Sequence, residues 1–174
     1  LEHAARVRTL NDRFDGLTLL AGIECDILPD GRLDLADECL AQLDIVVASV
    51  HSHFSQDESQ MTRRILTALE SPWLDVLGHP TGRLLLKREP VRIDMERVLA
   101  AAARNGVALE INCQVDRLDL NDTYARRARE RGARLVISTD AHSVIALGNL
   151  RWGVQVARRA WATPDDVLNT RSLD

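Results

Sequence analysis

Short apolar runs alternate with segments of helical apolar spacing along this chain, and that alternation restricts its fold more than any other feature. The runs lie at 17–27, 44–50, 73–77, 107–111 and 135–137. They are rich in Leu, Ile and Val, and they recur at intervals of roughly 25–30 residues, as strands do when helices separate them. Strands that alternate with helices form parallel sheets or barrels. The sequence therefore predicts an α/β fold of about five β/α units, with residues 1–174 as a single domain.

Residues with metal-ligand or hydrogen-bonding chemistry stand at the end of every predicted strand. In chain order they are Glu24, His51, His79, Asn112, Asp140 and His142. In parallel β/α folds the carboxyl ends of the strands meet at one end of the molecule, where functional residues collect. Three imidazoles and two carboxylates at such an end suit Zn²⁺, Mn²⁺ or Fe²⁺, and a carboxylate free to bridge suggests more than one ion.

Each of these residues also has a plain structural explanation when it is taken alone. Asp140 and His142 form a D-x-H triplet, which is more often a turn with a surface histidine. If the backbone there is extended, however, residues two apart point the same way, and the two side chains could bind one metal ion. Taken alone, Glu24 is equally well explained as a turn cap or as a site residue. His53 could face the same way as His51 or could equally be a loop histidine. The recurrence of the pattern at successive strand ends favours the metal site.

Composition excludes several classes of protein. The formal net charge of −4 argues against a globally basic nucleic-acid module but leaves room for local basic patches. The three cysteines show no CxxC spacing, which indicates a reducing compartment. No stretch approaches the ~20 apolar residues of a membrane helix, so we expect a cytoplasmic protein without membrane contact. The chain opens at Leu1 rather than at Met, as a piece of a longer protein would.

Several motifs resemble those of the PHP (polymerase and histidinol phosphatase) domain. They are G-x-E-x-D-I at 22–27, S-V-H-S at 49–52, G-H-P-T-G-R at 78–83 and S-T-D-A-H-S at 138–143. RLDL at 117–120 and the tail WGVQVARRAW…DDVLNT look more narrowly like the C-terminal PHP domain of bacterial family X DNA polymerases. The resemblance runs essentially from end to end of the chain.

This resemblance implies a distorted seven-stranded β/α barrel related to TIM barrels, of which the chain would form the C-terminal part. It also implies up to three divalent ions, Mn²⁺ or Zn²⁺, at the mouth of the barrel. Glu24 would bridge two ions, His51 and His79 would complete one site, Asp140 would hold the second ion, and His142 a third. Glu24, Asp140 and His142 would thus be the catalytic residues.

The chain departs from the family pattern at its start. The family opens with an H-x-H strand and a T-D-H strand that supply further ligands, and neither motif occurs here. On this chain only the site of Glu24, His51 and His79 is then complete, whereas the sites of Asp140 and His142 lack partners. The sheet would also have an unpaired edge, which is an aggregation liability.

The activity that the resemblance implies is a Mn²⁺-dependent 3′–5′ exonuclease acting on DNA 3′ ends in repair, with polymerase domains in the same parent chain. Its phosphate and substrate contacts would come from Arg83, Lys87, Asn112 and Arg117, with Asp26 beside them. Two alternatives stay open. One is a stand-alone phosphatase for a small phosphomonoester such as histidinol phosphate, and the other is a catalytically incomplete PHP scaffold.

Overall fold

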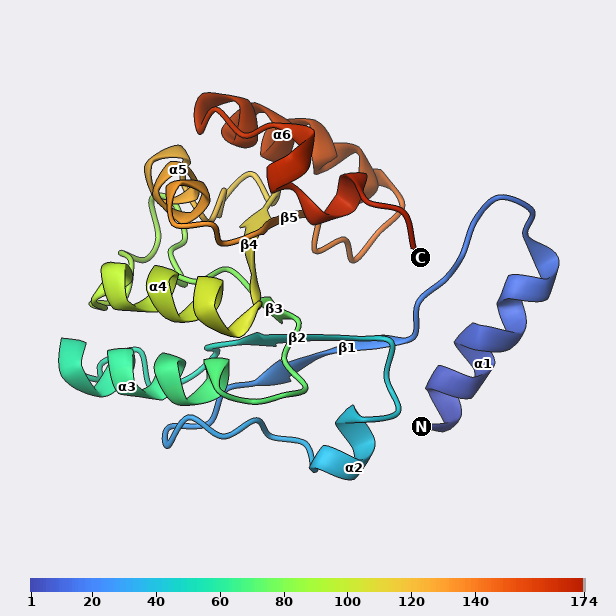
Figure 1. Ribbon diagram of the computed structural model, residues 1–174, viewed down its shortest axis with the longest axis horizontal. Coiled ribbons are helices and arrows are strands. Elements are labelled where there is room, and N and C mark those ends of the chain that lie inside the picture. Colours follow the sequence, from blue (N-terminus) through green and yellow to red (C-terminus); the bar gives the residue numbers. More distant parts are fainter. Residues whose placement is uncertain (174) are drawn as a thin grey trace.

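The computed structural model describes residues 1–173 and confirms the α/β fold (Figure 1). Five strands form one sheet in which every neighbouring pair is parallel, and their order in the sheet follows the chain. They are β1 (Gly22–Asp26), β2 (Ile45–Ser49), β3 (Val76–Leu77), β4 (Ala108–Asn112) and β5 (Leu135–Ser138). Because all neighbouring strands run parallel, all five carboxyl ends lie along one rim.

Helices connect the strands, and α3 to α6 follow one another along the same side of the curved sheet (Figure 1). The α-helices are α1 (Glu2–Leu10), α2 (Asp37–Leu40), α3 (Glu58–Leu69), α4 (Met95–Asn105), α5 (Asp122–Glu130) and α6 (Leu150–Arg159). Short 3-10 turns cover Asn11–Arg13, Ile145–Asn149, Pro164–Asp166 and Leu168–Thr170. The first helix, α1, stands apart from the rest, tied by Arg8 to the Asp44 carboxylate at 2.7 Å.

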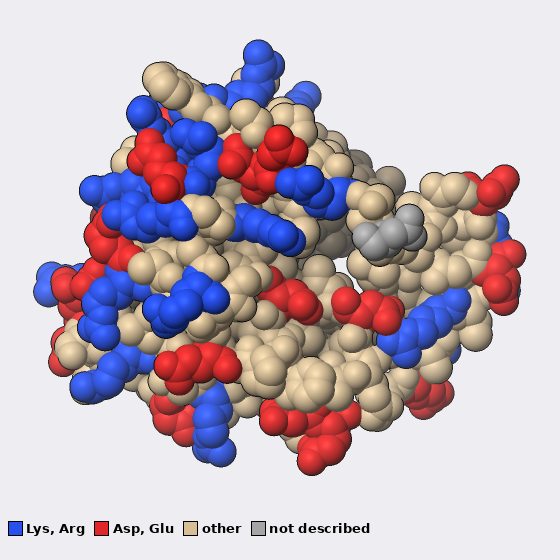
Figure 2. Space-filling model, viewed as in Figure 1, with Lys and Arg blue, Asp and Glu red and all other residues tan. Residues whose placement is uncertain are grey.

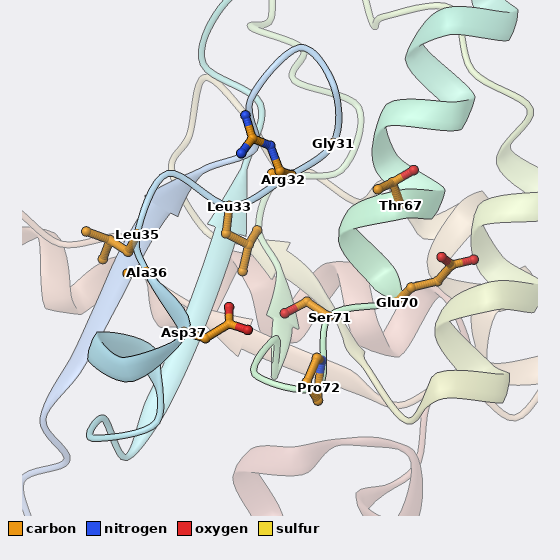
Figure 3. A pocket seen from close by; sticks show the side chains of 10 residues that line it. All are labelled: Gly31, Arg32, Leu33, Leu35, Ala36, Asp37, Thr67, Glu70, Ser71 and Pro72. Atoms are coloured by element: carbon orange, nitrogen blue, oxygen red, sulfur yellow. The ribbon is translucent and has the colours of Figure 1, made fainter.

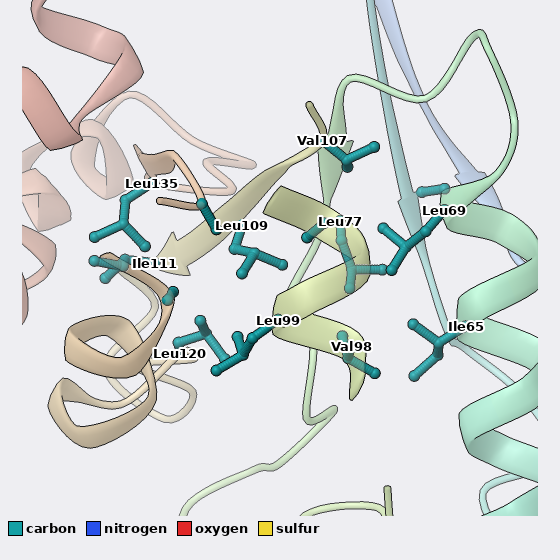
Figure 4. Close-up of a cluster of buried hydrophobic side chains, with 14 of the residues drawn as sticks. Ile65, Leu69, Leu77, Val98, Leu99, Val107, Leu109, Ile111, Leu120 and Leu135 are labelled. Carbon is teal, nitrogen blue, oxygen red and sulfur yellow. The ribbon is translucent and has the colours of Figure 1, made fainter. Parts of the chain in front are cut away.

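The two faces of the sheet have opposite chemistry, as the period of two along each strand requires. Toward the helices the strands present aliphatic side chains, which pack against Ile65, Leu69, Val98 and Leu99 in the core (Figure 4). On the other face, near the carboxyl ends, the strands present polar side chains: Glu24, Ser49, Glu110, Asn112 and Ser138. The core thus occupies one face and leaves the other to a polar site.

Local signals place the helix ends well. Asp94 caps α4 by accepting the Arg97 N–H at 3.1 Å, and α4 ends at Gly106, whose φ of 75° is left-handed. The sequence at 55–58 matches the S-x-x-E pattern of a capping box, but it is not the capping box of α3. The structure places the capping box two residues later, with Asp57 as the cap and Gln60 as its reciprocal partner.

The predicted strand at 17–27 is too long at its start. The strand ladder begins at Gly22, opposite Ile45. Before it, the Ala21 N–H donates to the Asp44 side chain and not to the backbone of β2. Leu17 and Leu20 are therefore exposed. At the other edge of the sheet, the Asn169 side chain accepts the Ile137 N–H at 2.7 Å and donates to the Ile137 carbonyl at 2.9 Å. The DDVLNT tail thereby covers the open edge of β5.

Basic and acidic side chains are interspersed over the helical side of the molecule (Figure 2). This mixture agrees with the small net charge of −4. Within residues 1–173, no helix is both long enough and apolar enough to span a bilayer.

Candidate metal centre

Three of the predicted ligands come together at the carboxyl ends of β1, β2 and β3. Glu24 lies in β1, His51 follows β2, and His79 follows β3. The Nε2 atoms of His79 and His51 lie 3.2 Å and 3.4 Å from the same carboxylate oxygen, Glu24 Oε1. One ligand atom from each of the three residues lies within 4.8 Å of the others. The two imidazoles meet edge to face, with ring centroids 5.1 Å apart.

Neighbouring side chains orient these ligands. Ser49 donates its hydroxyl to Glu24 Oε1 at 2.6 Å, and Asp26 Oδ1 lies 2.6 Å from His51 Nδ1. A carboxylate on Nδ1 turns Nε2 toward the cluster, as in the carboxylate–histidine pairs of metal sites. Hydrogen bonds from the rings of His51 and His79 hold the pKa of Glu24 well below its usual range. The Glu24 carboxylate, helped by Asp26, raises the pKa of His51 to about 9.

The cluster fits a divalent ion of the Zn²⁺ or Mn²⁺ type. Two imidazole nitrogens and an ionised carboxylate converge on one point, which is the donor set such ions prefer. His79 is 3% exposed, and its Nδ1 has no hydrogen-bond partner among the described residues. Glu24 and His51 remain open to the surface, so an ion bound there would also face solvent or a ligand.

We expect Asp26→Ala to weaken metal binding by about tenfold or more, because the carboxylate fixes the orientation of the His51 ring. Titration calorimetry with Zn²⁺ measures this effect. Asp30→Ala is the matched control, since Asp30 is an exposed carboxylate of the following loop that pairs with Arg32. Equal affinities of the two variants would contradict an orienting role for Asp26.

Asp140 and His142 lie outside this cluster. The Asp140 carboxylate accepts the Asn112 amide at 3.2 Å and lies 4.0 Å from Arg117 Nε. Extended geometry is wrong at this point, because Asp140 has a left-handed φ of 48°. Gln114 stabilises that turn by donating its amide to the carbonyls of Thr139 and Asp140. His142 consequently points outward, with its side chain 86% exposed.

A buried carboxyl group that was not predicted, Glu110, lies between the cluster on β1–β3 and the residues around Asp140. It contacts His79 on one side and Asn112 on the other. It accepts the backbone N–H of His79 and the hydroxyl of Ser138, and the Asn112 amide lies 3.4 Å away. Burial raises the pKa of Glu110. The sequence signal was available: Glu110 stands two residues before Asn112 in an otherwise apolar strand, and so shares its face.

Asp119 is a second buried carboxyl group, which accepts the Thr81 N–H at 3.0 Å. Burial raises the pKa of Asp119, so its ionisation opposes folding. The stability it contributes is present at low pH and declines as the pH rises from the ordinary Asp value toward the raised one. Asp119→Asn keeps an acceptor oxygen for Thr81 but cannot ionise.

We therefore expect Asp119→Asn to become more stable relative to the parent chain as the pH rises from 4 to 8. Urea unfolding across this range measures the difference. Asp165→Asn serves as the control, because the Asp165 side chain is 90% exposed. A difference that does not change with pH would show that Asp119 is ionised in the folded chain at all these values.

The basic residues predicted to contact phosphate already have partners within the chain. Arg83 donates to the backbone carbonyls of Arg117 and Leu118. Lys87 pairs with Asp116 at 3.2 Å, yet its side chain is 66% exposed. Arg117 reaches toward Asp140, and its Nη1 is buried without a hydrogen-bond partner among the described residues. The structure thus brings Arg117 and Asn112 to Asp140. Arg83 stabilises the backbone of residues 117 and 118.

A pocket of about 480 Å³ lies away from these residues (Figure 3). It is bounded by the loop 31–37 and by the end of α3 with the following Ser71 and Pro72. None of the strand-end residues lines it, so the candidate centre is defined by ligand chemistry and not by this cavity.

Comparisons with known proteins agree with this fold. No family model matches the chain. It is 42% identical over 172 residues to DNA polymerase/3′-5′ exonuclease PolX of Bacillus subtilis (strain 168), covering 99% of this chain and 30% of that protein. It is 32% identical over 180 residues to a probable phosphatase of Thermoanaerobacter sp. (strain X514), covering 98% of this chain and 71% of that protein.

A solved structure has the same fold. Histidinol phosphate phosphatase from Lactococcus lactis subsp. lactis Il1403, complexed with zinc, L-histidinol and phosphate, superposes with a TM-score of 0.60. The match covers 93% of this chain and 74% of that chain at 14% identity. Parallel β/α units with a His–carboxylate cluster at their strand ends define the structural class, and the relatives named here are phosphoesterases by name. The chain belongs to the PHP family.

Proposed function

We propose that this chain is the metal-binding part of a phosphoesterase that removes nucleotides from DNA 3′ ends. The single observation that carries the proposal is the convergence of Glu24, His51 and His79 on one point at the strand ends. The 42% identity to PolX over nearly the whole chain supports a DNA substrate over other phosphate esters. Because the chain spans only 30% of PolX, polymerase domains beside it and the single-domain organisation of residues 1–174 are part of the proposal.

Under this proposal each residue has a defined task. Glu24, His51 and His79 would hold a divalent ion, either Mn²⁺ or Zn²⁺, while Asp26 keeps the His51 ring oriented. An ion in such a site supplies Lewis-acid stabilisation of phosphoryl and leaving-group oxygens. Asp140 and His142 would serve further ions once partners from outside residues 1–174 complete their sites.

Arg117 supplies a positive charge on the Asp140 side of the site. Its Nε lies 4.0 Å from the Asp140 carboxylate, and its side chain is 18% exposed. Planar guanidinium groups suit bidentate contacts with phosphate. Arg117, with the Asn112 amide beside it, would therefore position the scissile phosphate opposite the cluster on β1–β3.

The experiment compares substrates and chain lengths. Residues 1–174, and a version extended upstream of Leu1, are incubated with Mn²⁺ and a 5′-labelled DNA strand, and in parallel with histidinol phosphate. We expect the extended protein to shorten the DNA from its 3′ end and to bind more metal by elemental analysis than residues 1–174. The result that contradicts the proposal is hydrolysis of histidinol phosphate by a protein that leaves DNA intact.

Hydrolysis of histidinol phosphate without cleavage of DNA would establish the phosphatase alternative. One observation favours this alternative. The chain covers 71% of the length of the probable phosphatase, a larger share than it covers of PolX. If neither substrate is cleaved by either protein, the scaffold alternative holds.

A further inference from the structure

The loop that leads away from His79 ends in an exposed apolar tip. Leu86 is more exposed than any other large apolar residue of residues 1–173, with a relative exposure of 107%. Its φ of 62° is left-handed, a backbone conformation that residues other than glycine rarely adopt. An exposed leucine is ordinary on a protein surface, but one displayed on a strained turn is not.

The turn is held by hydrogen bonds on both sides of the tip. Leu84 and Arg88 pair their backbones in both directions, with N–O distances of 2.9 and 2.7 Å. At the base of the loop, Arg88 Nε donates to the Gly82 carbonyl at 2.7 Å, and the Arg88 guanidinium stacks over the Phe54 ring. These contacts fix the backbone of the turn, while the Leu86 side chain is fully exposed in the described part of the chain.

A second apolar side chain accompanies the tip. The Leu85 N–H donates to the Asp116 carbonyl at 2.6 Å, which ties this loop to the one after β4. Val115, the residue before Asp116, is 57% exposed. The two loops thus present Leu86 and Val115 on adjacent segments. Lys87, next to Leu86, pairs with Asp116 at 3.2 Å and keeps its side chain 66% exposed.

The tip is connected to the candidate metal centre. Its loop starts at His79, whose carbonyl accepts the Gly82 N–H at 2.9 Å. Arg83, in the same loop, donates to the Arg117 carbonyl, and the Arg117 side chain reaches Asp140. The loop that carries Leu86 is therefore joined to residues at the strand ends at both His79 and Arg117.

We infer that Leu86, with Val115 and Lys87, forms a rim that packs against the bases of a single DNA strand whose 3′ end enters the site. The inference rests on the proposed function. A nucleic-acid strand has both of the required properties: apolar base faces for Leu86 and Val115, and phosphates for Lys87. A small phosphomonoester has no run of bases and further phosphates to contact these residues, so the rim would select polynucleotides over such esters.

Binding of two oligomers tests the rim without any need for catalysis. One probe is a 5′-fluorescent single-stranded 12-mer of DNA with phosphorothioate linkages, which resist cleavage. The other is an abasic 12-mer with the same number of charges. We expect Leu86→Gly to weaken binding of the first probe about fivefold, as loss of a leucine contact does, and to leave the abasic probe unchanged. Lys87→Gln should weaken both.

The variants have built-in folding controls. Glycine favours the φ of 62° at position 86, so Leu86→Gly should unfold at no lower temperature than the parent chain. Leu173→Gly is the matched control, because Leu173 is 67% exposed and lines a pocket at the amino ends of the strands, beside Ile45 and Asp75. It should bind both probes as the parent chain does.

The outcomes separate this inference from the proposed function. Two results would contradict the base contact while the parent chain still binds the base-bearing probe. In the first, Leu86→Gly binds this probe with the affinity of the parent chain. In the second, Leu86→Gly loses affinity for both probes equally; in either case the proposed nuclease function stands. If the parent chain binds neither probe but hydrolyses histidinol phosphate, the proposed function fails, and this inference with it.

Discussion

Glu24→Ala should abolish tight metal binding, with a loss of affinity of about 100-fold or more. Glu24 Oε1 is the one oxygen that both His51 Nε2 and His79 Nε2 approach, at 3.4 and 3.2 Å. Without the Glu24 carboxylate, only the two imidazoles remain as ligands. Asp26 still turns the His51 ring toward the position from which the carboxylate has been removed. Titration calorimetry with Mn²⁺ and with Zn²⁺ measures the loss, and any metal-dependent activity should disappear with it.

The matched control is Glu38→Ala, which removes an exposed carboxylate from α2 and leaves the strand ends untouched. It should bind metal as the parent chain does. Retention of tight binding by Glu24→Ala would exclude Glu24 as a ligand, and would move the centre toward Asp140 and Asn112.

Arg64→Met should destabilise the fold by about 3 kcal/mol, the range seen when a buried hydrogen-bonded charge is removed and its partners are left unpaired. Arg64 is 1% exposed and lies in α3. Its guanidinium donates to the carbonyls of Ile27 and Ser52 and to the side chain of Gln56. Methionine fills much of the volume but offers no donor, so both carbonyls lose their partner.

Urea unfolding measures this loss, and Arg63→Met supplies the comparison, since Arg63 is the exposed neighbour on the same helix. A second readout concerns the site. Ile27 directly follows Asp26, and Ser52 directly follows His51, so Arg64 fixes the ends of two strands that hold the cluster. We expect Arg64→Met to weaken Zn²⁺ binding even at temperatures where it is fully folded. Full stability would show that water satisfies the two carbonyls.

The positions of the strands and of the first ligand cluster could be predicted because both depend on local patterns. An apolar run followed by a histidine is legible in the sequence, and parallel pairing then brings His51 and His79 to the same rim as Glu24. Among residues 1–173 the structure brings together the ligand atoms of Glu24, His51 and His79. The ligand roles themselves, including those of Asp140 and His142, remain predictions.

Features that depend on contacts between distant segments could not be predicted. Arg64 lies within the apolar stripe of α3, but its partners are backbone carbonyls, which leave no trace in the sequence. The left-handed turn at Asp140 is held by Gln114, from the loop after β4. The D-x-H spacing alone leaves a turn and an extended backbone both open, and the contact with Gln114 decides for the turn.

Strand order that follows chain order has a consequence for how the protein folds. Each strand pairs with one only a single β/α unit away, as with Gly22 and Ile45, so every pairing closes a short loop of chain. The units that contain Glu24, His51 and His79 can therefore dock during synthesis before β4 has left the ribosome. The His79 backbone, however, is bonded to Glu110 of β4. A nascent chain would thus bring Glu24, His51 and His79 together early. The position of His79 would be fixed only when β4 joins the sheet and Glu110 accepts its backbone N–H.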